Sequence, residues 1–515
     1  MLALSRQLKA ARRRMAARVH ALQGSWRTFV GGIAVLLLVC GCAVGPNFHR
    51  PDAPHVTQYS HGTESTETVS VEGSVQRFEL GKAVTAEWWH LFQSSKLDAI
   101  ITEAIANNPG LDAVQATLKA SQDNLRSGYG IFDPAVDADI GVARERYTSA
   151  NIGEKVPGTV FNLFTLSTSV SYALDVFGGQ RRLVEGLHAE VDVAHANELA
   201  AYLALTGNIV NTVIARAAYR AEVDATKQLI ELQKEQVQLA EIQAQAGTVP
   251  YSTVLSLRSQ LASYEATIPQ LEQKSTQSGH LLTALTGHVP AEWRAPDVSL
   301  RDLTLPNDLP VSLPSALVRQ RPDILAAEAA AHAASANIGV ATAALLPSVT
   351  LNGGLQAASN STSMLFPANG KAWSIGADAT APLFEGGTLW FRRKAALENY
   401  RQAMALYRQT VLGAFEQVAD SLRALDHDAR SLLAEDESLA AADQALHLIQ
   451  ANYQAGLATY LDVLNADTQY HLATIADIQA IAVRYQDTVA LFAALGGGWW
   501  NVERGDLGAG APKEQ

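Results

Sequence analysis

The chain has 515 residues, of which 48% are hydrophobic and 17% charged, with two cysteines and a formal net charge of −12. This composition excludes a disordered chain and a small scaffold held together by disulfides. The first 41 residues contain seven cations and no acid, so their removal would take the net charge from −12 to −19. So acidic a mature chain argues against a nucleic-acid partner, because phosphate binding needs a basic surface.

Residues 1–41 have the order of a secretory signal peptide. A cationic segment reaches Arg27, an apolar run extends from Phe29 to Val39, and Cys40-Gly41-Cys42 follows. The apolar run is too short to span a bilayer, which takes about 20 residues. Val39-Cys40-Gly41-Cys42 looks like a bacterial lipobox, which predicts cleavage before Cys42 and a covalent lipid such as palmitate on that residue. Cleavage elsewhere, with both cysteines incidental, is the alternative.

The residue after Cys42 is Ala43 rather than Asp. By analogy with the sorting of bacterial lipoproteins, this favours the outer membrane over the inner membrane. The cationic segment is unusually long, which makes Met15 an alternative start of translation. A chain begun at Met15 should then be exported and lipidated as well as the full one. No cofactor is expected besides the lipid on Cys42.

Several landmarks occur twice along the chain. Pro109 and Pro134 are 25 residues apart, as are Pro322 and Pro347, and both pairs bracket an Ala-rich helical stretch. Further landmarks recur in the same order at nearly one offset, which is 209 for the Gln-Ala-Gly turns and near the 213 between the first prolines. These are Gln245-Ala246-Gly247 with Tyr251, repeated as Gln454-Ala455-Gly456 with Tyr460, and the corners Phe177-Gly178-Gly179 and Phe384-Glu385-Gly386-Gly387. The order predicts two tandem repeats, each with a helix, two strands, a long helix, a turn and a second helix.

Alternating apolar and polar residues predict strands in both repeats. The apolar positions are Phe164, Leu166, Thr168, Val170, Tyr172 and Leu174 in the first repeat, and Val349, Leu351, Gly353, Leu355, Trp373, Ile375 and Ala377 in the second. Strands of about 10 residues with one apolar and one polar face suit a membrane barrel. A soluble sandwich with its apolar face inward is the alternative.

Two helical segments are exceptionally long. Gly207 is the only Gly or Pro from Leu187 to Ala246, and Gly413 is the only one from Thr388 to Ala455. At about 1.5 Å per residue each could extend about 90 to 100 Å, as in a coiled coil rather than a compact domain. Two hairpins supply four strands, whereas the smallest membrane barrels need about eight, so the barrel must be shared between chains. A trimer would supply twelve strands, and a dimer eight.

The residues resemble the TolC-like outer-membrane efflux proteins, especially the lipidated branch typified by OprM and NodT. The resemblance covers nearly all of the mature chain. It rests on the ordered set Cys42-Ala43-Val44-Gly45-Pro46 with Pro51, Trp88-Trp89 with Phe92 and Leu97, the two Gln-Ala-Gly turns, and Leu495-Gly496-Gly497-Gly498-Trp499. It implies an α+β membrane protein, a homotrimer whose shared twelve-stranded β-barrel is continuous with a long α-helical periplasmic tunnel.

The same resemblance implies a function. It predicts a passive exit duct of a tripartite efflux pump, joined through a periplasmic adaptor protein to an inner-membrane pump of the resistance-nodulation-division type, and exporting small molecules such as drugs. The expected division of the chain is a signal peptide at 1–41, a lipidated segment at 42–96, a first repeat at 97–290 with its hairpin at about 135–175, a linker at 291–312, a second repeat at 313–500 with its hairpin at about 347–382, and a flexible tail at 501–515.

In the family, the Gln-Ala-Gly turns lie at the periplasmic tip, where helices close the tunnel. Carried over by position, the resemblance implies that Tyr453, Leu461, Asp462 and Asn465 line or brace the constriction, with Ser252 as the first-repeat counterpart of Leu461. A threefold axis would make a ring of three Asp462 carboxylates, which would attract cations and raise the pKa of its members. The alternative is that Asp462 caps the helix after the turn. Many relatives carry a carboxylate in place of Asn465, so a second acidic ring is absent here.

The glycines of these motifs have a conformational role in this interpretation. Gly247 and Gly456 are expected to permit the helix-to-helix turns, and Gly178-Gly179 and Gly386-Gly387 the strand-to-helix corners. Exposed residues near Thr248 and Leu457 are expected contacts of the adaptor.

No HExxH, Walker loop, GxSxG or CxxC motif occurs, so no enzymatic activity is expected. Asp426-His427-Asp428 is interpreted as a solvated helix face rather than a metal site, and Trp88-Trp89 as packing or a membrane-proximal anchor. Two other functions stay open, a duct for type I protein secretion and a periplasmic coiled-coil lipoprotein without a pore. The cargo and the particular pump and adaptor cannot be predicted from the sequence.

Overall fold

The computed structural model describes residues 43–61, 65–71, 74–147, 158–365 and 371–499. The predicted signal peptide, Met15, Cys42 and the tail lie outside these residues. The chain forms two compact units, each drawing on both halves of the sequence. Unit 1 consists of Met1–His49, Ala120–Val191 and Ala329–Met404, and unit 2 of Arg50–Lys119, Asp192–Glu328 and Ala405–Gln515.

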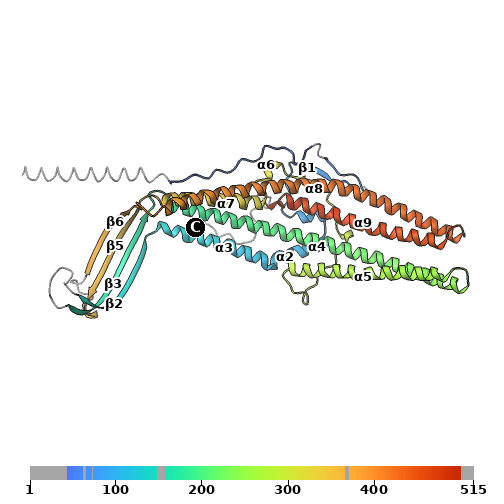
Figure 1. Cartoon of the computed structure of the whole chain (residues 1–515), viewed down its shortest axis with the longest axis horizontal. Helices are drawn as coiled ribbons and strands as arrows, with labels where there is room; N and C mark the ends of the chain where they lie inside the picture. Colours follow the sequence, from blue (N-terminus) through green and yellow to red (C-terminus); the bar gives the residue numbers. More distant parts are fainter. Residues whose placement is uncertain (1–42, 62–64, 72–73, 148–157, 366–370, 500–515) are drawn as a thin grey trace, which may run out of the picture. The chain divides into compact units, whose positions relative to one another are not determined.

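The order of a helix, two strands, a 67-residue helix and a 35-residue helix occurs twice (Figure 1). The first set is α3 (Pro109–Tyr129), β2 (Ala135–Tyr147), β3 (Thr159–Leu174), α4 (Gly179–Gln245) and α5 (Tyr251–Leu285). The second set is α7 (Pro322–Ala343), β5 (Ser348–Ser359), β6 (Lys371–Thr380), α8 (Thr388–Gln454) and α9 (Tyr460–Ala494). Each 67-residue helix extends about 100 Å, which confirms the length expected from the scarcity of Gly and Pro.

The remaining elements are short, apart from one helix of 13 residues. They are β1 (Arg77–Leu80), η1 (Trp88–Phe92), α2 (Ser95–Asn107), η2 (Gly130–Phe132), η4 (Leu300–Asp302), β4 (Asp308–Val311), α6 (Pro314–Leu317) and η5 (Thr362–Met364).

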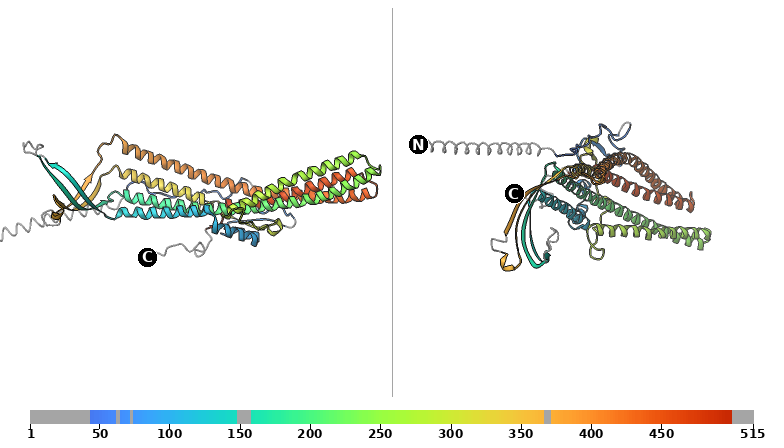
Figure 2. Two further views of the ribbon diagram at one scale, coloured as in Figure 1. Left: turned by 90° about the horizontal axis from the view of Figure 1, so that it is seen from below. Right: turned by 60° about the vertical axis from the view of Figure 1, so that its left-hand side comes forward.

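Unit 1 contains an antiparallel sheet in the order β2-β3-β5-β6 (Figures 1 and 2). The register places Leu166 opposite both Ile140 and Ala357, and Leu355 opposite Trp373. Because directly opposite residues share a face, one face is apolar across all four strands. That face is open in the protomer, with Ile140 82% and Ile375 83% exposed. A soluble sandwich would instead cover it with a second sheet.

Unit 2 is organised around a core that the N-terminal segment helps to build. Trp88 and Trp89 are 1% and 3% exposed, and the Trp88 ring lies 5.4 Å from the Phe492 ring of α9. The tryptophan pair therefore has the packing role, and the alternative of a membrane-proximal anchor is wrong because neither ring reaches the surface. Strand β1 pairs in parallel with β4, which lies within the segment 291–312 interpreted as a linker. Leu309 and Val311 of β4 are completely buried, so this segment belongs to the core.

Candidate functional site

The two turns that join α4 to α5 and α8 to α9, both in unit 2, contain the same backbone hydrogen bond. The N–H of Thr248 donates to the Gln243 carbonyl at 2.9 Å, and the N–H of Leu457 donates to the Asn452 carbonyl at 2.8 Å. Gly247 and Gly456 precede these donors with φ of +73° and +75°. This is the helix C-terminal motif in which a left-handed residue follows the last turn, a conformation that favours glycine.

The helices that leave the two turns begin differently. Thr459 caps α9, because its hydroxyl accepts the Asp462 N–H at 3.3 Å while an Asp462 carboxylate oxygen accepts the Thr459 N–H at 2.8 Å. The Thr459 hydroxyl also donates to that carboxylate at 2.6 Å. Helix α5 instead has Pro250 at this position, with no side-chain cap. The capping role considered for Asp462 is therefore present in the protomer.

Within one protomer, the cap sets the direction of the Asp462 pKa shift. Hydrogen bonds from the Thr459 hydroxyl and then from its backbone N–H lower the pKa of this exposed carboxyl. The rise predicted for a ring of three Asp462 carboxylates around a threefold axis concerns the trimer and stays a prediction. Within one protomer the donors of the cap stabilise the charged form, so the pKa falls.

Tyr453 connects the second helical hairpin to α4. Its hydroxyl accepts a hydrogen bond from Gln243 Nε2 at 2.9 Å, and its ring meets the Tyr460 ring edge-on at 5.7 Å. The Tyr460 hydroxyl donates to Gln236 Oε1, also at 2.9 Å. Burial raises the pKa of Tyr460 far above its ordinary value. Two tyrosines of the α8–α9 hairpin are thus tied to two glutamines of α4.

The other predicted gate residues lie at the surface. Asp462 and Asn465 line one hollow of about 300 Å³, whose other walls come from α8 and α9. Leu461 is 61% exposed, and Ser252 is exposed near the start of α5. The structure therefore brings Asp462 and Asn465 together and places Tyr453 in a separate contact with α4.

Sequence reasoning missed a buried polar group farther along α9. Asp467 is 1% exposed, one of its carboxyl oxygens has no hydrogen-bond partner among the described residues, and burial raises its pKa to about 6. His471, 6% exposed, packs against the Tyr264 ring at 5.3 Å, and burial lowers its pKa. The spacing of Tyr460, Val463, Asp467 and His471, in steps of three and four, was the available signal of a buried seam.

The Asp426-His427-Asp428 segment is not a solvated face, and this interpretation was wrong for Asp426. Asp426 is 4% exposed and pairs with Arg430, four residues on, at 2.7 Å. Asp428 makes a side-chain hydrogen bond to Asp487, whose pKa rises to about 8, first through burial and then through this neighbour. Among the described residues no group of three or more His, Cys, Asp or Glu side chains is placed to hold a metal ion.

The corner glycines lie in unit 1, where the long helices α4 and α8 begin. Gly178, Gly386 and Gly387 have φ of +78°, +61° and +86°, whereas Gly179 lies in α4 and its missing Cβ avoids a 2.9 Å approach to Ala343. Before α4, the Asp175 carboxylate accepts the backbone N–H groups of Gln180 and Arg181 at 3.0 Å each. An acid at this position satisfies donors that a helix start leaves unpaired.

Residues 100–288 and 313–497 match the family model described as outer membrane efflux protein, and the chain belongs to this family. It is 27% identical to the pyoverdine export outer membrane protein OpmQ of Pseudomonas aeruginosa, over 81% of this chain and 89% of that protein. It is 28% identical to nodulation protein T of Rhizobium leguminosarum bv. viciae, over 90% of this chain and 92% of that protein. The solved structure of the outer-membrane channel OprN superposes with a TM-score of 0.80 at 26% identity, covering 89% of this chain and all of that one.

The protein is therefore an outer-membrane efflux channel, the exit duct of an efflux system, and it extends into the periplasm. Proteins of this family are channels and not enzymes. The resemblance inferred from the ordered set of sequence motifs is confirmed.

Proposed function

We propose that three copies of this chain close a twelve-stranded barrel in the outer membrane, continuous with a periplasmic tunnel of long helices. The observation that carries this proposal is the sheet of unit 1, whose apolar face is open and whose outer strands are β2 and β6. In a bilayer every backbone hydrogen-bonding group must be paired, so β6 of one copy must pair with β2 of the next. Four strands cannot close on themselves, and twelve enclose a lumen.

Helices α4 and α7 are also long and apolar enough to cross a membrane. Core helices share these properties, and half of the most apolar stretch of α4 is buried. The strands are the better candidates, since their exposed apolar face runs over the whole sheet.

The trimer is tested by the mass of the purified protein in detergent, before and after heating. A mass of three chains that falls to one on heating supports the shared barrel. A monomer at every detergent concentration would refute it. Replacing Gly376 of β6 by proline removes one backbone donor and should weaken the trimer if that donor faces the next copy.

The expected partners are a periplasmic adaptor and an inner-membrane pump, with small molecules as cargo. The name of OpmQ, a pyoverdine export protein, supports export of a small molecule. The exposed apolar residues at the turns, Leu457 (80%), Leu461 (61%), Tyr251 (60%) and Leu255 (53%), support a protein contact near Thr248 and Leu457. A crosslinker at residue 457 should capture the adaptor in cells, and one at the buried face of α9 should not.

The constriction of the duct is proposed at these turns, where a trimer would bring three copies of Asp462 together. Asp462→Asn removes the charge, and Thr459→Ala removes the cap of α9 while the carboxylate stays. If the ring of charge closes the channel and selects cations, only Asp462→Asn lowers cation preference and raises conductance. Equal effects of the two variants would assign the closure to the helix cap, and no effect of Asp462→Asn would refute the charged ring.

A covalent lipid on Cys42 is proposed as the outer-membrane anchor. The lipobox-like segment 39–42 and Ala43 after it support this. The mass of the N-terminal peptide of the mature protein tests it directly. A chain that starts at residue 42 with added lipid mass is expected, and an unmodified cysteine would contradict the proposal.

A further inference from the structure

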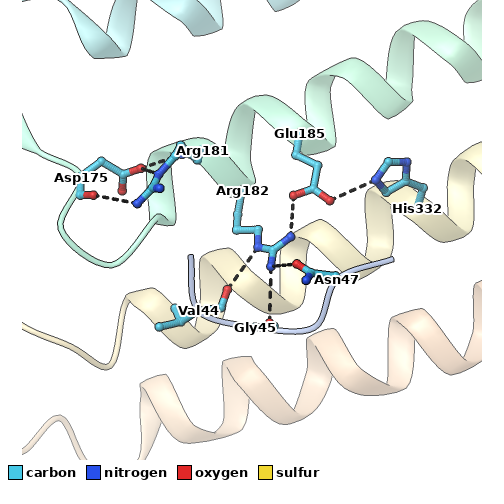
Figure 3. A network of polar contacts seen from close by, with 8 residues as sticks. All are labelled: Val44, Gly45, Asn47, Asp175, Arg181, Arg182, Glu185 and His332. Atoms are coloured by element: carbon cyan, nitrogen blue, oxygen red, sulfur yellow. Dashed lines mark hydrogen bonds and ion pairs between the residues drawn. The ribbon is translucent and has the colours of Figure 1, made fainter. Parts of the chain in front are cut away.

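The residues that follow Cys42 pass α4 and α7 as an irregular segment with a bend at Gly45, which we call the N-terminal strap, residues 43–48 (Figure 3). The strap and the parts of α4 and α7 that contact it, residues 179–191 and 329–343, belong to unit 1. The strap begins beside the corner that joins β3 to α4, because the N–H of Val44 donates to the Phe177 carbonyl at 2.9 Å. Ala43 lies against Gly178, where a Cβ atom would approach within 2.5 Å of it.

One buried arginine of α4 holds the strap. Arg182 is 4% exposed, and its guanidinium donates to the Val44 carbonyl at 3.2 Å, the Gly45 carbonyl at 3.4 Å and the Asn47 side-chain oxygen at 2.7 Å (Figure 3). The planar fork of an arginine can serve three such acceptors at once, which a lysine ammonium cannot do in the same geometry.

A second layer of contacts fixes the arginine itself. Arg182 Nη1 pairs with a Glu185 oxygen at 2.7 Å, and the other Glu185 oxygen meets His332 Nε2 of α7 at 3.0 Å. The His332 ring stacks on Phe48 of the strap at 4.6 Å. The chain of contacts thus starts at the strap, passes through α4 and α7, and returns to the strap.

A glycine of α7, Gly339, leaves room for the N-terminal strap. A Cβ atom at Gly339 would lie 2.6 Å from Arg182 Cγ and 3.0 Å from the Val44 carbonyl oxygen. A Cβ atom at Gly45 would lie 2.5 Å from Gly339 Cα. Two backbones therefore meet with no side chain between them, and this glycine requirement does not depend on any charge.

We propose that Arg182 is a positioning residue for the lipid anchor: it holds the N-terminal strap against α4 and α7, so that Ala43, the residue next to the modified cysteine, stays at the β3–α4 corner. This inference rests on the lipidation proposed above. Without the Arg182 contacts, residues 42–48 would be a flexible segment about 23 Å long, and the lipid would no longer hold the corner at a fixed distance from the membrane.

The neighbouring Arg181 provides a matched control. It lies one residue away on α4 and has the same charge, but its guanidinium pairs with Asp175 at 3.0 Å (Figure 3). Gly186 is the control for Gly339, because it lies in α4 of the same unit and a Cβ atom there has ordinary contacts, the nearest at 3.7 Å.

The experiment measures how fast a maleimide modifies Val44→Cys in the purified full-length protein. The sequence has only Cys40 and Cys42, so lipidation of Cys42 and loss of Cys40 with the signal leave residue 44 as the one free thiol. Arg182→Ala and Gly339→Ala should each speed labelling by about tenfold or more. The first loses a charge-assisted hydrogen bond to the strap, and the second loses the close contact between the backbones of α7 and the strap. Arg181→Ala and Gly186→Ala should label at the parent rate, and Arg182→Lys should fall between.

Labelling at the parent rate in both Arg182→Ala and Gly339→Ala would overturn the proposal. If Arg182→Ala fails to assemble, Gly339→Ala and Arg182→Lys still decide the question. The labelled peptide also separates this inference from the lipidation, because a free Cys42 would take up a second maleimide. A doubly labelled peptide would refute the anchor, while the rate at residue 44 would still report on the strap.

Discussion

Replacing Tyr453 by phenylalanine should make the channel open more often, if opening moves the α8–α9 hairpin away from α4. The change removes the hydroxyl that accepts the Gln243 hydrogen bond at 2.9 Å and keeps the ring against Tyr460. Loss of one such bond costs about 1 kcal/mol in each copy. That is about fivefold in the ratio of closed to open states for a hairpin that moves alone.

A trimer that opens in one concerted step would add the three losses. The total of about 3 kcal/mol corresponds to more than about a hundredfold in the same ratio. Tyr453→Ala should open the channel further, because the edge-to-face pair is worth about 0.5–1.5 kcal/mol more. The size of the effect therefore distinguishes independent from concerted opening.

Open probability in single-channel recordings from planar bilayers measures this ratio. Tyr485→Phe is the matched control, since it removes a hydroxyl that donates to the Leu303 carbonyl at 2.9 Å in the core of unit 2, where no turn lies. An unchanged open probability for Tyr453→Phe would refute the reasoning. An equal rise in Tyr485→Phe would show that general loosening, and not the contact with α4, is responsible.

Four further predictions concern stability and insertion. Thr459→Ala should destabilise the protein by about 1 kcal/mol through loss of the α9 cap, measured by thermal unfolding. Asp467→Asn should stabilise the protein at pH 7.5 and not at pH 4, because the folded-state pKa of Asp467, about 6, lies above the ordinary value of about 3.9. The stability contributed by the protonated carboxyl is therefore fully present below pH 4 and falls by about 3 kcal/mol as the pH rises through 6. A wild-type melting temperature that is equal at both pH values would contradict this. Ile375→Lys on the apolar face of β6 should reduce the yield of heat-resistant trimer at a cost of about 2–4 kcal/mol, whereas Ser374→Lys on the opposite face should be tolerated. Trp88→Ala should cost about 3–5 kcal/mol, because the ring is 1% exposed against Phe492, and chemical denaturation would show no change if the ring were dispensable.

The long helices and the large sheet were predictable because each depends on local periodicity. The 67-residue helices follow from segments in which a single glycine interrupts an otherwise helical composition, and the alternation around Leu166 and Leu351 survives in the observed register. Pairing of β1 with β4 was not predictable. These strands have four residues each, which is too few for a periodic pattern. Their first paired residues, Arg77 and Asp308, are separated by more than two hundred residues of chain.

The candidate site was predicted in part. Turn glycines could be identified because a left-handed residue after a helix strongly favours glycine. The Tyr453–Gln243 and Tyr460–Gln236 contacts join helices far apart in sequence, so the sequence identified only Tyr453 of these four as a gate residue. Asp426 was wrongly predicted to be solvated because helix periodicity indicates only which face of a helix is apolar. Arg430, one turn further along α8, pairs with Asp426 and allows an acid to lie within the buried face.

The most direct test of the exit duct is the single-channel conductance of the purified, lipidated protein in a planar bilayer, with its mass determined in the same detergent. We expect a trimer that carries small, cation-preferring currents, because in the proposed assembly three copies of the four-stranded sheet would enclose a lumen and three Asp462 carboxylates would face its narrow end. A monomer that carries no current would contradict the proposed lumen shared by three chains.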